Sequence, residues 1–162
     1  MRWSCRLFLA LSLVLLGSLP GAHAQVTFSV TYQDVINNNG IGFNQGGGVV
    51  TTRQATISSM LGYLQTVIDG RGSAQLHFQT SLTSGTGFLA AFGPNNFVNI
   101  LGSFQNGGVY QRLRTGGSTF AGPDGDGQVN FGYNWNNGTG APSGSQFDLY
   151  SVALHEVAHG LG

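Results

Sequence analysis

The five residues His155-Glu156-Val157-Ala158-His159 combine types and spacing that could carry out metal-assisted hydrolysis. In a helix, His155 and His159 would lie one turn apart on the same face, so both imidazoles could reach one metal ion. Glu156, next to the first histidine, could then act as the general base for a zinc-activated water. The spacing therefore predicts a zinc site with two of the three protein ligands that a catalytic zinc takes.

Chance is the alternative explanation for such a short motif, and the composition argues against it. The chain of 162 residues contains four histidines and six acidic residues, and Glu156 is its one glutamate. Three of these uncommon residues stand together at the spacing that metal binding needs. We therefore interpret them as a functional group rather than as part of an ordinary amphipathic helix.

The longer stretch HEVAHGLG, residues 155–162, resembles the metzincin metallopeptidases, whose pattern is His-Glu-x-x-His-x-x-Gly-x-x-His. The resemblance implies that His155 and His159 are zinc ligands and that Glu156 is the general base. Gly162 would let the helix end and the chain turn, while Gly160 would leave space beside His159. A third ligand, His or Asp, is expected three residues after Gly162, with a methionine turn further on.

The resemblance also implies how a peptide substrate is held. In that family the substrate lies antiparallel to an edge strand just upstream of the active-site helix, through main-chain hydrogen bonds. Residues 128–134 are the candidate for this strand. Because such pairing reads no side chains, the sequence does not define a specificity pocket.

Two other groups of polar residues have alternative interpretations. His77 could complete the zinc site in principle, but it falls on an expected strand far upstream, which favours an ordinary strand histidine. Asp124-Gly125-Asp126-Gly127 alternates acids and glycines, as calcium loops do. It lacks the further oxygen ligands and the terminal glutamate of an EF-hand, which favours a plain turn.

The first 24 residues are typical of a secretory signal peptide. Arg2 and Arg6 precede an apolar run, and Ala22-His23-Ala24 forms a small-x-small cleavage site. A membrane anchor is the alternative, but the run is shorter than the roughly 20 residues that span a bilayer. Cleavage would remove the single cysteine, so we expect a secreted domain with neither a disulfide nor a membrane-spanning segment.

The remaining residues, 25–162, have the size of one domain. Charged residues make up 7% of the chain and the formal net charge is zero, so no basic surface for nucleic acid is expected. The surface must instead be built from amide, hydroxyl and glycine residues. A peptide or protein is the expected binding partner.

Hydrophobic periodicity predicts an α+β fold. Alternation favours strands at residues 26–32 and 75–82, with further strands at 97–104 and 128–133. Helical spacing favours a helix over residues 53–69, capped by Thr52. Ser145 and Asp148 form a capping-box pattern before the helix that carries the motif. Residues 122–127 are expected to form a turn.

The order of these elements implies a zincin-like mixed sheet with two main helices, the second of which carries the HExxH motif. Residues 25–162 would form the N-terminal part of such a domain. The expected function is that of a secreted zinc endopeptidase. The alternative is an exported surface or adhesion domain, rich in glycine and asparagine, that keeps the fold without catalysis.

Overall fold

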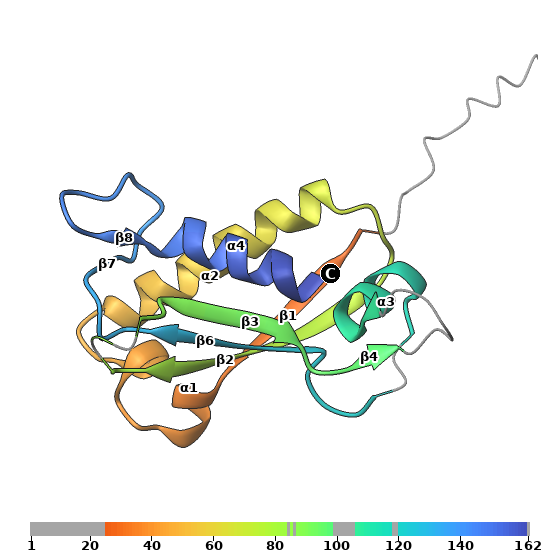
Figure 1. The fold of residues 1–162 in the computed structure, drawn as a ribbon, viewed down its shortest axis with the longest axis horizontal. Helices are drawn as coiled ribbons and strands as arrows, with labels where there is room; N and C mark the ends of the chain where they lie inside the picture. Colours follow the sequence, from red (N-terminus) through yellow and green to blue (C-terminus); the bar gives the residue numbers. More distant parts are fainter. Residues whose placement is uncertain (1–24, 84, 86, 99–105, 118–119, 162) are drawn as a thin grey trace, which may run out of the picture.

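The computed structural model describes residues 25–83, 85, 87–98, 106–117 and 120–161. The expected signal peptide lies outside the described residues. Within them the fold is mixed α+β, with four α-helices and a mixed main sheet (Figure 1). None of the helices in this part of the chain combines the length and the hydropathy that crossing a membrane requires.

The main sheet has four strands in the order β1-β2-β6-β3. Strands β1 (Thr27–Tyr32), β2 (Ser73–Ser81) and β6 (Gly125–Asn130) run parallel, and β3 (Ala90–Pro94) pairs antiparallel with β6. Two small two-stranded ladders complete the strands: β4 (Phe97–Val98) with β5 (Asn106–Gly107), and β7 (Trp135–Asn136) with β8 (Phe147–Asp148).

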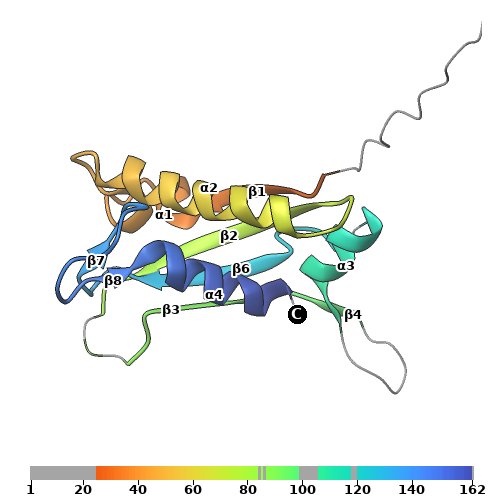
Figure 2. The same ribbon diagram turned by 90° about the horizontal axis from the view of Figure 1, so that it is seen from above.

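Helices α2 (Val49–Val67) and α4 (Leu149–Leu161) lie side by side on one face of this sheet (Figures 1 and 2). Helix α2 lies along the β1 side, and α4 packs against β6 and β3. Shorter helices follow β1 and β5, with a 3-10 turn between the first of them and α2. These are α1 (Gln33–Asn37), η1 (Gly42–Asn44) and α3 (Gly108–Thr115).

The core lies between the sheet and the two long helices. In β2, Leu76 and Phe78 are buried beneath the helices, while His77 points to the other face, as the two-residue period of a strand requires. The helices bury one stripe each. The buried residues of that stripe are Ile57, Met60, Leu61 and Leu64 in α2, and Leu149, Ala153 and Val157 in α4.

Both predicted helix starts were wrong in detail. Helix α2 begins at Val49 after Gly48, whose φ of 81° lies in the left-handed region that glycine tolerates. Thr52 lies inside the first turn, where its hydroxyl donates to the Gly48 carbonyl. In α4 the cap is Asp148, whose Oδ2 accepts hydrogen bonds from the amide and the hydroxyl of Ser151, at 3.1 and 2.5 Å.

The predicted turn at residues 122–127 was also wrong in its second half, because β6 already begins at Gly125. Gly125 and Gly127 face the ring of Phe92 from β3, and a Cβ on either glycine would overlap that ring. The glycines therefore serve close packing inside a strand rather than a turn. Of the strand expected at 97–104, β4 covers the first two residues, and residues 99–104 lie outside the described part.

A buried arginine ties the loops at one end of the sheet to α2. Arg53 donates to the Gly42 carbonyl at 2.7 Å and to Gln45 at 2.9 Å, and its guanidinium lies 3.8 Å from the ring centroid of Phe131. Burial lowers the pKa of Arg53, and the charge of Asp34 opposes this shift. The charge is thus held inside by hydrogen bonds and by an aromatic face.

Candidate functional site

The motif residues lie on α4, whose orientation is fixed by its buried stripe and by its last turn. Gly160 lies against the ring of Phe92, and a Cβ at this position would overlap that ring. The glycine thus lets the end of α4 approach β3 closely. This contact gives Gly160 a packing role against the neighbouring strand, in addition to the space beside His159 that the sequence suggested.

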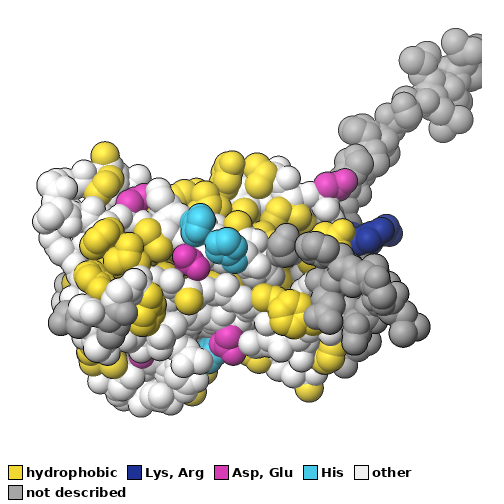
Figure 3. All heavy atoms as spheres, viewed as in Figure 1, with side chains coloured by type: hydrophobic (Ala, Val, Ile, Leu, Met, Phe, Trp, Pro, Cys, Tyr) yellow, Lys and Arg dark blue, Asp and Glu magenta, His cyan; other side chains and the backbone are white. Residues whose placement is uncertain are grey.

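The two motif histidines lie close together on the exposed side of α4. The Nε2 atoms of His155 and His159 are 3.1 Å apart, and their rings are nearly perpendicular, at 87°. Glu156, which stands between the two histidines in the sequence, is half-buried. Figure 3 shows two adjacent histidine side chains with an acidic side chain close by, on the face over α4.

The distance between the two Nε2 atoms is close to the distance expected when both nitrogens bind the same zinc ion. Two imidazole nitrogens bound to a tetrahedral zinc at about 2.0–2.1 Å lie roughly 3.3–3.4 Å from each other. The observed 3.1 Å is within a few tenths of an ångström of that value. Among the described residues, however, no third His, Cys, Asp or Glu joins the pair to form a group of three potential ligands.

His77 lies elsewhere in the molecule. Its side chain is on the face of the sheet away from α4, and its Nδ1 is 2.5 Å from Oδ1 of Asp126, its register partner on β6. The ring cannot reach His155 and His159 through the sheet. The structure therefore does not bring His77 to the motif, and the histidine has a carboxylate partner of its own.

The two aspartates in the segment predicted to be a turn, residues 122–127, also have partners in the fold. Asp124 is 2% exposed, and its carboxylate accepts hydrogen bonds from the Arg112 guanidinium at 3.2 Å and from the backbone N–H of Gln75 at 2.8 Å. Asp126 contacts His77 from the neighbouring strand. These carboxylates hold the start of β6 to β2 and α3.

The edge strand beside the motif differs from the one predicted. Residues 128–130 belong to β6, which lies inside the sheet between β2 and β3. The edge strand next to α4 is β3, antiparallel to β6. Its sequence, AAFGP, contains glycine, proline and a single large apolar residue, so no strong strand signal was present. The alternation of Phe92 with the small residues Ala91 and Gly93 was the available clue.

Comparison with known proteins gives no assignment: no family model, curated protein or solved structure matches this chain. A function for this chain is therefore inferred from the α4 histidines, from Glu156 and from the strand beside them.

Proposed function

We propose that this protein is a secreted zinc-dependent endopeptidase of the metzincin type, in which His155 and His159 hold the metal and Glu156 is the general base. The observation that carries the proposal is the 3.1 Å separation of the two Nε2 atoms on exposed rings of one helix. The mixed α+β fold, with the motif on its last helix, is compatible with a zincin-like domain. A third ligand, three residues beyond Gly162, is part of the proposal.

In the proposed mechanism, His155 and His159 would bind the metal and Glu156 would transfer protons. The imidazoles of His155 and His159 bind through Nε2 in their neutral form, which leaves each Nδ1 to carry the proton. A bound zinc ion would supply a Lewis acid that polarises a carbonyl and acidifies water. The carboxylate of Glu156 would accept a proton from the attacking water and pass it to the leaving amine.

The substrate would lie along β3. The outer edge of this strand has no partner among the described strands, so its main-chain groups are available to an extended peptide. The close contact between Gly160 and Phe92 keeps this edge next to the last turn of α4. A peptide paired with β3 would therefore pass the exposed histidines.

Hydrolysis of an unfolded protein tests the proposal directly. In protein that includes the residues encoded after Gly162, we expect cleavage that a zinc chelator abolishes and added zinc restores. Cleavage that survives complete removal of metal would contradict the zinc mechanism. Reading the coding sequence past Gly162 separates the alternatives: His or Asp at the third position supports the peptidase, and other residues there support a non-catalytic surface domain.

Export is a separate part of the proposal. The leader pattern predicts that the secreted protein begins at Gln25. N-terminal sequencing of protein recovered from the medium of an expressing host would check this. Protein that stays in the cytosol with Met1 intact would contradict it.

A further inference from the structure

The free edge of β1 lacks the features by which proteins usually protect a sheet edge. This strand pairs with β2 on one side and, among the described strands, with nothing on the other. Its six residues, TFSVTY, include no charge, no proline and no glycine. Exposed edge strands are usually blunted by charged side chains, prolines, bulges or a covering segment. An uncharged edge of this length is suited to pair with another strand.

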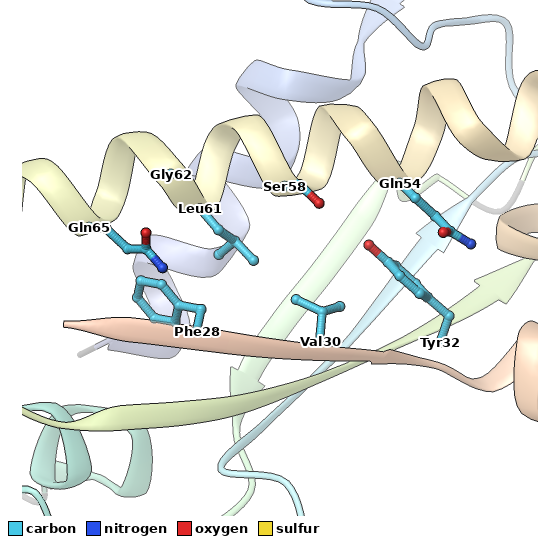
Figure 4. Close-up of a pocket in the computed structure, with 8 residues that line it drawn as sticks. All are labelled: Phe28, Val30, Tyr32, Gln54, Ser58, Leu61, Gly62 and Gln65. Atoms are coloured by element: carbon cyan, nitrogen blue, oxygen red, sulfur yellow. The ribbon is translucent and has the colours of Figure 1, made fainter.

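A groove runs beside this edge, between β1 and α2, with a volume of about 400 Å³ (Figure 4). The half-buried side chains Phe28, Val30 and Tyr32 point from β1 toward the helix and form its apolar side. Helix α2 contributes Ser58 and Gln65 on the other side. None of the groove's side chains is charged at neutral pH, so a partner that enters it must be uncharged there as well.

Two features of the groove are left without a contact by the described residues of the chain. Gly62 lines it from the interior of α2, where glycine weakens a helix, yet a Cβ at this position would meet no atom within 4 Å. No described residue hydrogen-bonds to the Tyr32 hydroxyl, and burial alone raises the pKa of this side chain. The space in front of Gly62 and the hydroxyl of Tyr32 are thus both available to a partner.

We propose that two copies of this chain associate through β1, which pairs antiparallel with β1 of the partner about a two-fold axis at Val30. In this register Phe28 lies opposite the partner's Tyr32, and Ser29 lies opposite the partner's Thr31. Aromatic and hydroxyl cross-strand pairs of this kind are favourable. Because β1 and the groove carry no charge, the two-fold axis brings no like charges together.

The pairing would also fill the groove. The helix-side residues of an added strand project toward α2, so the partner's Phe28 and Tyr32 would enter the space in front of Gly62. The two four-stranded sheets would become one continuous sheet. Strand β3 and the α4 histidines lie at the opposite edge from β1, so they would stay exposed in both copies.

Sedimentation equilibrium of the expressed chain tests this assembly. We expect twice the monomer mass for the wild type and the monomer mass for Ser29→Lys, because the two exposed lysines would lie diagonally across the axis, about 7–8 Å apart, where their like charges repel each other. Gln75→Lys is the matched control: Gln75 is the register partner of Ser29, on the same face but one strand inward. This variant should remain a dimer. A monomeric wild type, or the same mass for both variants, would overturn the proposal.

Cross-linking gives a second readout that does not depend on disrupting the strand. In a Cys5→Ser background, the double variant S29C/T31C should form a disulfide-linked dimer under mild oxidation, because these positions face each other in the proposed register. The double variant Q75C/T31C should not cross-link between chains. Equal cross-linking of the two would mean that the chains associate through another surface, which would contradict pairing through β1.

Discussion

Two parts of the molecule place an imidazole beside another polar side chain, and they leave very different possibilities for a ligand. On the sheet, His77 is 12% exposed and its ring nitrogen lies 2.5 Å from the Asp126 carboxylate. On α4, His155 and His159 are exposed, and among the described residues the one side-chain polar contact of each ring is with the other. The first histidine has its partner within the fold. The second pair presents two nitrogens to one point, where a cation can bind both.

The two sites also differ in what creates them. The His77 contact depends on the register of β2 and β6, which joins residues 49 positions apart. The α4 pair needs only a helix, because residues four apart share a face. A local spacing can therefore specify a metal-binding pair, whereas a strand histidine receives its partner from the tertiary fold.

The largest expected effect concerns Glu156. In protein that includes the third ligand, Glu156→Gln keeps the size of the side chain but removes the base. Peptide hydrolysis should fall by roughly 10²-fold or more, the usual scale for losing an acid–base group, while the zinc content persists. Steady-state kinetics and metal analysis of the same samples would check both parts. Unchanged activity would mean that Glu156 is not the base.

A substitution of Gly160 tests the close contact between β3 and α4, the helix that carries the histidine pair. The added methyl group of Gly160→Ala would overlap the ring of Phe92, so we expect the free energy of unfolding to fall by about 1–3 kcal/mol. Urea titration would measure this change. Gly46→Ala is the control, since a Cβ there has open space and should leave stability unchanged or raise it by up to about 1 kcal/mol. Equal effects in the two variants would contradict the packing role of Gly160.

The smallest effect is expected at the His77 pair. Because Asp126 is 39% exposed, solvent screens its interaction with His77, and Asp126→Asn should cost at most about 1 kcal/mol of unfolding free energy. Zinc affinity should not change, since this pair lies on the other face of the sheet. A clear loss of zinc affinity in the variant would show that the two histidine sites are coupled.

Local patterns predicted much of this fold. The alternation in β1 and β2 and the helical spacing in α2 and α4 identified those elements, because each turns one face toward the core, half-buried in β1 and largely buried in the other three. Strand β3 was missed, since Ala91 and Gly93 give little signal. Gly125 and Gly127 suggested a turn by their residue type. Their packing role was not visible in the sequence, because the ring that they accommodate, Phe92, belongs to a strand distant in sequence.

In the candidate site, too, local sequence patterns predicted some features, whereas others depend on tertiary contacts. The sequence indicated His155, Glu156 and His159 from their spacing alone, and the structure places the two imidazoles together on one face of α4. It did not indicate the edge strand beside them, because the order of strands in a sheet depends on tertiary pairing. Nor did it indicate that Asp124 would pair with Arg112 from α3.

Zinc titration of this chain, followed by calorimetry with a competing chelator, tests most directly whether the α4 histidines form a metal site. With two imidazole ligands the 162-residue chain should bind zinc measurably but weakly. His159→Ala should weaken this binding by at least about 10-fold, the smallest loss usual for disturbing a metal's ligands, and His77→Ala should leave it unchanged. Binding that survives His159→Ala but is lost in His77→Ala would contradict the account.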